Sequence, residues 1–223
     1  DGGVMIRSIH PPVPTGDATA RYERLSHGGA TWYDLMPTPA NGTDGGTPGF
    51  WPNFDGVSWA TIGKPAKLDF ANAFTICGWA FQSADPPTQG NEFVISRDGA
   101  TRNVIYLQSD NGNRITFFGW TPAFNSAQGP VTTPAGIWYF TSCVNEGIGG
   151  DLLLYIDGAL AGSDAGGGGA VAWGADDWEF GRPQNGLALD YFTGQIDTGR
   201  FYNRALSPDE ILRDYHAGKP AHP

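Results

Sequence analysis

The most constraining feature of this sequence is a regular alternation of short apolar segments with turn-forming residues. The chain has 33 glycines and 17 prolines, so 50 of its 223 residues belong to these two types, about twice their average frequency of about 12%. Because both residues interrupt helices, this frequency argues against a helical bundle. Short segments of β character follow one another from residue 57 onward, and they predict an antiparallel sandwich or barrel rather than a parallel sheet. These segments are 57–63, 74–81, 92–96, 103–109, 114–119, 137–145, 152–157, 159–163, 178–181 and 191–202.

One helix is predicted near the end of the chain, over residues 208–216. Ser207 is placed to cap it, Pro208 suits the first helical position, and Glu210 completes a capping box. Gly218 is expected just beyond the last turn, where glycine commonly ends a helix.

The remaining segments indicate one domain with an arm. Residues 1–20 contain closely spaced prolines, which favour an extended conformation, and residues 21–223 are expected to form a single folded domain. Residues 37–53 are predicted to be irregular, and the glycine-rich stretch 165–170 is predicted to be a flexible loop tip. Because the chain opens on Asp1-Gly2-Gly3 and not on Met, we expect a processed form or a part of a longer chain.

The charge of the chain excludes several classes of partner. The sequence has 23 acidic and 13 Lys or Arg residues, which gives a net charge of −10 and a pI near 4.6. Such an acidic chain is not expected to bind nucleic acid or an anionic membrane surface. No apolar run reaches the roughly 18 residues that a membrane helix needs, so no membrane insertion is predicted.

Three parts of the sequence carry a family resemblance: Phe54-Asp55-Gly56 with Phe74–Trp79, Ile137–Phe140 with Leu152–Gly158, and Phe192–Asp197 with Phe201–Ile211. Together they resemble laminin-G-like, concanavalin A-like jelly rolls over roughly residues 20–217. The resemblance implies an all-β fold, with two curved antiparallel sheets stacked face to face and one short C-terminal helix. It leaves function open, because such folds serve as lectins, adhesion modules, enzyme appendages and virion parts.

The two cysteines, Cys77 and Cys143, lie in segments that correspond to cysteine-bearing strands of the related pentraxins. That resemblance implies a disulfide between them across neighbouring strands. The alternative is two buried free thiols, because cysteine is often buried without bonding. A disulfide would favour a secreted or particle-surface setting.

The pentraxin resemblance does not carry the calcium site of that family across. Asn103 matches a ligand position, but Arg102 replaces the neighbouring Asp; Gln184 and Asn185 fall in the later ligand run, where Pro183 replaces Glu. Calcium prefers several carboxylate oxygens, so the double site is expected to be lost and no cofactor to be required. Asn103, Gln184 and Asn185 remain candidate ligand-binding residues. A single structural calcium is left open, although its candidate ligands are better explained as turn or edge residues: Asp55, Asp110, Asp190 and Asp197.

No enzymatic constellation is present in the sequence. Some concanavalin A-like folds are glucanases, which carry alternating acidic residues on one strand, because a retaining glycosidase needs two carboxyl groups about 5–5.5 Å apart. The nearest approach here is Asp176-Asp177-Trp178-Glu179. Asp176 and Asp177 point to opposite faces of a strand, so Glu179 shares a face with Asp177 only. We therefore expect that the chain is not an enzyme.

Aromatic side chains are the remaining candidates for ligand contact. Trp120 and Phe124 are predicted to lie in one loop, and Trp173 and Trp178 flank the glycine-rich stretch. Exposed aromatic rings stack on the flat faces of sugars. The alternative is that these rings fold back and plug the edges of the sandwich.

Two functions are therefore compared. The first is a non-catalytic, lectin-like binding or adhesion module, secreted or on a particle surface, whose partner is a glycan or a surface protein. The second is a structural or decoration subunit of a virion, phage tail or surface filament, in which residues 1–20 contact copies of the chain or other subunits.

Overall fold

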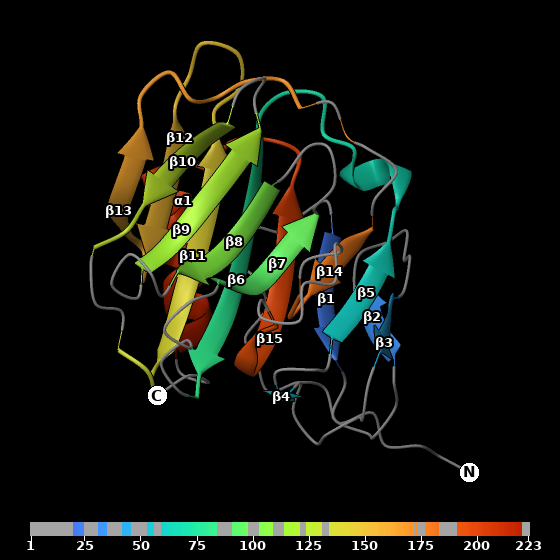
Figure 1. The fold of residues 1–223 in the computed structure, drawn as a ribbon. Helices are drawn as coiled ribbons and strands as arrows, with labels where there is room; N and C mark the ends of the chain where they lie inside the picture. The colour runs from blue at the N-terminus through green and yellow to red at the C-terminus, as the bar shows by residue number, and fades with distance from the viewer. Residues whose placement is uncertain are drawn as a thin grey trace.

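A computed structural model gives the fold of residues 20–24, 31–34, 42–45, 53–55, 59–83, 91–97, 103–108, 114–120, 124–130, 134–171, 173, 177–182 and 191–219. These residues form mostly strands (Figure 1). The strands are β1 (Ala20–Arg24), β2 (Thr31–Asp34), β3 (Gly42–Gly45), β4 (Asn53–Asp55), β5 (Trp59–Gly63), β6 (Phe74–Gln82), β7 (Asn91–Arg97), β8 (Asn103–Gln108), β9 (Arg114–Trp120), β10 (Phe124–Gln128), β11 (Trp138–Asn145), β12 (Leu152–Ile156), β13 (Ala159–Asp164), β14 (Trp178–Phe180) and β15 (Thr193–Tyr202). A 3-10 turn spans Ala66–Leu68, and the helix α1 spans Pro208–Gly218.

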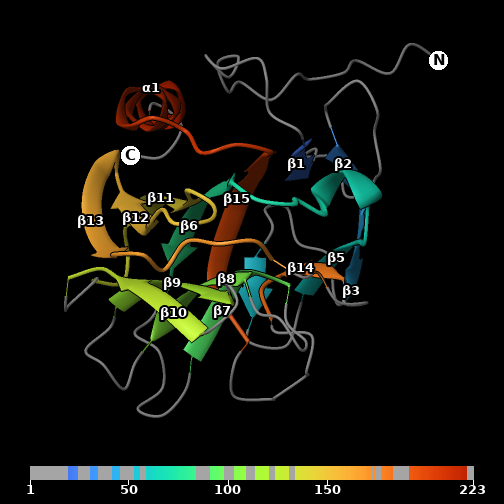
Figure 2. The same ribbon diagram turned by 90° about the horizontal axis from the view of Figure 1, so that it is seen from above.

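The strands follow one hydrogen-bonded path that folds over into two layers. The order is β10-β9-β8-β7-β14-β5-β3-β2-β1-β15-β6-β11-β12-β13, with β4 paired to β15, and the pairings are antiparallel. We call β10, β9, β8, β7, β14 and β5 the front sheet, and β1, β15, β6, β11, β12 and β13 the back sheet. Figure 2 shows these two layers stacked, with α1 outside the back sheet. The predicted two-sheet antiparallel sandwich with one short helix is confirmed.

The main core lies between the two sheets and follows from the alternation of side chains along each strand. Phe74, Ile76 and Ala80 of β6 point inward and are buried against front-sheet residues such as Phe117. The rings of Phe74 and Phe117 meet edge to face, with centroids 6.4 Å apart. Because the alternate residues of β6 are covered as well, this strand is apolar along nearly its whole length.

A second apolar cluster lies on the outer face of the back sheet, beneath α1. Trp79 and Phe140 belong to it, and Tyr215 of the helix stacks on Trp79 with ring centroids 5.8 Å apart. Gly218 lies within the helix rather than beyond it as predicted. A Cβ at Gly218 would lie 2.3 Å from the Trp79 indole nitrogen, so the glycine allows the close approach of helix and sheet.

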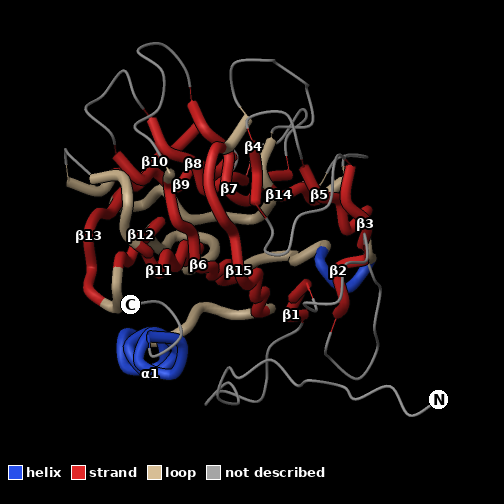
Figure 3. The backbone as a smooth tube through the Cα atoms, turned by 90° about the horizontal axis from the view of Figure 1, so that it is seen from below, coloured by secondary structure: helices blue, strands red, loops and turns tan. Residues whose placement is uncertain are grey.

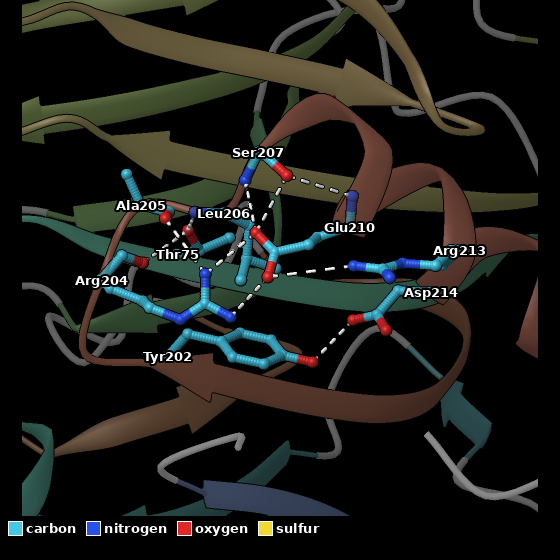
Figure 4. Close-up of polar contacts among 9 residues, drawn as sticks. All are labelled: Thr75, Tyr202, Arg204, Ala205, Leu206, Ser207, Glu210, Arg213 and Asp214. Carbon is cyan, nitrogen blue, oxygen red and sulfur yellow. Dashed lines mark hydrogen bonds and ion pairs between the residues drawn. The ribbon is translucent and has the colours of Figure 1, made fainter. Parts of the chain in front are cut away.

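The start of α1 is held by the predicted capping box (Figure 4). The Glu210 amide donates to Ser207 Oγ at 3.4 Å, and the Ser207 amide donates to Glu210 Oε2 at 2.8 Å. Arg204 Nη2 lies 2.7 Å from Glu210 Oε1. Hydrogen bonds from Arg204 and from the Ser207 amide lower the pKa of Glu210 to about 2. The chain entering the helix is therefore tied to its first turn by charge as well as by the cap.

Polar groups also lie in the buried contact between α1 and the back sheet. Tyr202 donates a 2.6 Å hydrogen bond to Asp214 Oδ2 (Figure 4), and Arg200 Nη1 lies 3.7 Å from the same oxygen. The side chains of Arg200 and Asp214 are 2% and 0% exposed. The helix is thus joined to the sheet by a buried charge pair in addition to its apolar face.

The predicted disulfide is not formed. The strand register places Cys77 opposite Ser142 and Cys143 opposite Ile76, and residues directly opposite each other share a face of the sheet. Cys77 therefore lies beneath the helix and Cys143 lies between the sheets, both buried and free. Burial raises the pKa of Cys77 to about 12 and that of Cys143 well above its ordinary value.

The glycine-rich stretch is a second correction, because its residues are fixed by hydrogen bonds. Asn145 Nδ2 donates to the Gly169 carbonyl at 2.8 Å and the Gly168 amide donates to the Gly150 carbonyl at 3.0 Å. A Cβ at Gly168 would lie 2.8 Å from the carbonyl oxygens of Gly147 and Gly150. Glycine is required here for close packing, not for flexibility.

The N-terminal expectations are tested only in part. The region 37–53, predicted to be irregular, contains β3 and the first residue of β4. Residues 1–19, which make up nearly all of the predicted arm, lie outside the described residues.

Candidate functional site

The outer face of β9 and β10 combines aromatic and polar side chains. Ile115 and Phe117 of β9 and Ala127 of β10 belong to the core, so the alternate residues point away from it. The register places Phe118 opposite Ser126 and Thr116 opposite Gln128. We call this surface the β9–β10 face, and it comprises Arg114, Thr116, Phe118, Phe124, Ser126 and Gln128. Figure 3 shows β9 and β10 on the opposite side of the sandwich from α1.

One end of the β9–β10 face is aromatic. The rings of Phe118 and Phe124 pack with centroids 4.1 Å apart, and Phe124 remains 51% exposed. Phe124 was predicted to be a loop residue, but it begins β10 and pairs with Trp120, the last residue of β9. A phenyl ring held by a strand and by a second ring is a rigid apolar platform.

The other end of the face is polar. Arg114 Nη1 donates a 2.9 Å hydrogen bond to Gln128 Oε1. Between this pair and the aromatic rings lie Ser126 and Thr116. The Thr116 hydroxyl is buried and has no hydrogen-bond partner among the residues that the structure describes. The Ser126 amide donates to Asp164 Oδ2 of β13 at 2.9 Å. The face therefore offers amide, hydroxyl and guanidinium groups beside an apolar ring, the combination that binds sugar rings and their hydroxyls.

A second polar cluster lies at the far side of the front sheet, around Glu179 of β14. Arg182 donates to both carboxylate oxygens of Glu179, from Nε and Nη2, at 2.8 Å each. The Arg182 guanidinium also lies 3.7 Å from the ring centroid of Trp59, and its Nη1 lies 3.5 Å from the Tyr191 hydroxyl. Glu179, the nearest approach to a catalytic acid in the sequence, thus has both oxygens engaged by an internal guanidinium.

Trp173 is not the exposed platform that the sequence suggested as one alternative. Its indole nitrogen donates a 2.7 Å hydrogen bond to the Phe70 carbonyl. Its ring packs against Trp178 and Phe74, with centroids 5.4 and 5.7 Å away. Trp178 is itself fully buried. Trp173 and Trp178 therefore close the edge of the core, which is the other alternative.

The remaining predicted site residues are placed only in part. Asn103 begins β8, and its backbone lies opposite Gly119 of β9. Trp120 is placed by its backbone at the end of β9. Gln184 and Asn185 lie outside the described residues, so their meeting with Asn103 stays a prediction.

Two of the four candidate calcium ligands lie among the described residues. Asp55 ends β4, Asp197 lies within β15, and Asp110 and Asp190 fall outside the described residues. Within the part of the chain that the structure describes, no three His, Cys, Asp or Glu side chains are grouped to hold a metal ion.

The sequence of residues 54–212, which is 159 of 223 residues, matches the family described as the concanavalin A-like lectin/glucanases superfamily. The chain belongs to this superfamily. No curated protein sequence matches it. Within the described residues, no helix of this superfamily member is long and apolar enough to cross a membrane.

Several solved structures share the fold at low sequence identity. The botulinum neurotoxin serotype C1 binding domain is 12% identical with a TM-score of 0.64, and the match covers 90% of this chain and 52% of that one. Domain 4 of AbnA, an extracellular arabinanase from Geobacillus stearothermophilus, in complex with arabinotriose, is 16% identical with a TM-score of 0.65 over 89% of this chain and 98% of the domain. The CBM40 of Ruminococcus gnavus IT-sialidase, bound to α2,3 sialyllactose, is 12% identical with a TM-score of 0.55 over 66% and 84%. The chain thus spans about half the length of the neurotoxin domains it matches.

Proposed function

We propose that this chain is a non-catalytic glycan-binding module and that the β9–β10 face is its binding site. The observation that carries the proposal is the exposed ring of Phe124, which is held against Phe118 beside a row of polar side chains. Two of the structural neighbours support it, because one was solved with arabinotriose and another with sialyllactose.

In the proposed complex, one sugar ring lies on Phe124 and the next units follow the strands toward Gln128. The C–H face of a sugar packs against an aromatic ring, while its hydroxyls exchange hydrogen bonds with polar side chains. Ser126 and Gln128 supply such groups along β10. Trp120, paired with Phe124 across the hairpin, is proposed to extend the aromatic end of the site.

The proposed module acts by attachment rather than by chemistry. Glycoside hydrolysis requires one carboxyl group that gives up a proton and a second that attacks or activates water, and Glu179 is engaged by Arg182 on both oxygens. A site of this kind binds each glycan weakly and gains strength when several copies are displayed together. We propose that it works outside the cell or on a particle surface, where glycans are its partners.

A glycan array tests the proposal, with the labelled wild-type chain compared with Phe124→Ala. We expect the wild type to bind a defined set of glycans, and Phe124→Ala to bind them at least about tenfold more weakly because the stacking surface is lost. Leu160→Ala is the matched control, because Leu160 is a similarly exposed apolar residue of β13, away from the site (57% against 51%). Wild-type binding that survives in Phe124→Ala, or no binding by the wild type, contradicts the proposal.

A further inference from the structure

The outer edge of β10 lies against β13, and the structure describes both strands throughout. β10 is the end of the hydrogen-bonded strand path, with β9 on one side and β13 on the other. Figure 2 shows β13 curving from the back layer toward the layer of β9 and β10. The two strands meet at Ser126, whose amide donates to Asp164 Oδ2 at 2.9 Å. The carboxyl group of Asp164 therefore borders the β9–β10 face.

The two oxygens of the Asp164 carboxylate differ in their contacts. Oδ2 accepts the Ser126 amide, whereas Oδ1 has no hydrogen-bond partner among the residues that the structure describes. The Asp164 residue is partly exposed. A carboxylate is an acceptor with about four lone-pair sites, so Asp164 can accept a further hydrogen bond from a ligand.

The turn that follows β13 holds this carboxylate in place. The Gly167 amide donates to the Asp164 carbonyl at 3.1 Å. Asn125 of β10 donates to the Gly167 carbonyl at 3.2 Å, and the Gly166 amide donates to Asp151 Oδ1 at 2.8 Å. A Cβ at Gly167 would lie 3.0 Å from Asp164 Cγ, so the turn packs closely against the carboxyl group. An acceptor that is fixed before the ligand arrives loses less conformational entropy on binding.

The spacing along β10 brings this acceptor close to the aromatic end of the face. Phe124 and Ser126 are two residues apart on one strand, so they share a face and are separated by roughly 7 Å. The hydroxyls of a sugar lie at the edge of its ring. A sugar stacked on Phe124 therefore turns hydroxyls toward Ser126 and Asp164.

The charge of Asp164 determines which ligand group fits beside it. A hydroxyl that donates to a carboxylate forms a charge-assisted hydrogen bond, which is roughly twice as strong as a neutral one. A ligand carboxylate has no proton to donate and is repelled by the like charge. The contact with the Ser126 amide does not itself require a charge, because the side-chain carbonyl of an asparagine could accept it equally.

We propose that Asp164 is a specificity-determining residue of the β9–β10 face and selects neutral sugars. In the proposed complex, Asp164 Oδ1 accepts a hydrogen bond from a hydroxyl of the sugar stacked on Phe124, and a sugar with a carboxylate at this position is disfavoured. The inference rests on the proposed function and adds the class of sugar bound at the aromatic end of the site.

The test compares Asp164→Asn with Asp151→Asn. Asp164→Asn keeps an acceptor for the Ser126 amide but replaces Oδ1 by an amide group that donates, and it removes the charge. Asp151→Asn is the matched control, because it removes the same charge from an acid just before β12, outside the β9–β10 face, that also accepts a glycine amide. NMR titrations of the wild type, both variants and Phe124→Ala use two pairs of ligands: methyl glucoside with methyl glucuronide, and the methyl ester of trigalacturonate with trigalacturonate.

We expect the wild type to bind the neutral member of at least one pair about fivefold more tightly than the acidic member, with a shift of the Ser126 amide resonance. Asp164→Asn should bind that neutral ligand about tenfold more weakly, as for the loss of a hydrogen bond to a charged group, and should lose the preference. Asp151→Asn should keep the affinity and the preference within about twofold.

The outcomes separate this inference from the proposed function. Equal or tighter binding of the acidic members by the wild type, neutral binding that Asp164→Asn retains, or an equal loss in Asp151→Asn overturns the role of Asp164 and leaves glycan binding in place. Binding of none of the four ligands, or binding that Phe124→Ala does not weaken, overturns both proposals. Circular dichroism checks that each variant keeps the fold. If Asp164→Asn does not fold, the preference of the wild type and its decrease with added salt still test the selectivity.

Discussion

Both outer faces of the sandwich carry aromatic side chains, but the rings are buried on one face and exposed on the other. On the back sheet, Trp79 and Phe140 are each 1% exposed because α1 covers them. On the front sheet, Phe124 stays 51% exposed beside Phe118. The comparison teaches that aromatic content along a strand does not distinguish buried, stabilising rings from exposed rings that are free to meet a ligand; what covers the strand distinguishes them.

The largest expected effect contrasts one ring from each face. Trp79→Ala removes a buried indole from beneath α1 and should lower the free energy of unfolding by about 4 kcal/mol. Phe124→Ala should change it by less than about 0.5 kcal/mol, as for an ordinary surface substitution. Urea unfolding followed by tryptophan fluorescence and circular dichroism measures both. Comparable losses in the two variants would remove the distinction between the faces.

A somewhat smaller effect is expected from the buried charge beneath the helix. Asp214→Ala leaves Arg200 without its carboxylate and Tyr202 without its 2.6 Å acceptor, so a loss of about 3 kcal/mol is expected. Asp209→Ala is the control, because it removes an exposed acid from the same helix. If both variants unfold at the same urea concentration, the buried pair does not hold the helix.

The N-cap of α1 should contribute less to the free energy of unfolding than the buried charge pair does. Ser207→Ala removes the side-chain acceptor of the Glu210 amide, and an N-cap of this kind typically contributes about 1 kcal/mol. Ser163→Ala, at an exposed position of β13, is expected to change stability much less. Thermal unfolding of the two variants checks the difference. An unchanged midpoint for Ser207→Ala would show that the stability of α1 does not depend on its N-cap.

The smallest expected effect is a pH dependence from Glu210. Its pKa is lowered from 4.5 to about 2 in the folded chain, so its contribution is present above pH 4.5 and is lost as the pH falls toward 2. We expect less than about 1 kcal/mol, because the Arg204 side chain is 38% exposed and the pair is screened by water. The difference in unfolding free energy between wild type and Glu210→Gln should shrink over this pH range. A constant difference would assign the effect to the cap alone.

Local patterns predicted the parts of the fold that depend on neighbouring residues. The helix was expected over 208–216 and spans Pro208–Gly218, because Ser207, Pro208 and Glu210 act within one turn. The disulfide failed because it depends on the register between two strands. A shift of one residue in that register exchanges the two faces of a strand, and the cysteines lie on opposite faces.

The candidate site could be predicted only in part from the sequence, for the same reason. Phe124 was singled out as a ligand contact, but the hairpin that turns it into a strand residue was missed. Arg114 and Gln128 become partners only through the pairing of β9 with β10. The alternation of Arg114, Thr116 and Phe118 with the core residues of β9 was the signal that marks this face, and its meaning depended on knowing which side of the strand was buried.

The way the sheet closes bears on aggregation when many copies of the chain lie close together. The hydrogen-bonded path ends at β10 and β13, and these end strands lie against each other: Asn125 Nδ2 donates to the Gly167 carbonyl, and a Cβ at Gly162 would lie 2.1 Å from the Gln128 carbonyl oxygen. Open edge strands invite strand addition between molecules. A chain whose two edge strands shield one another can be held at high local density, as the proposed multivalent attachment requires, with less risk of aggregation.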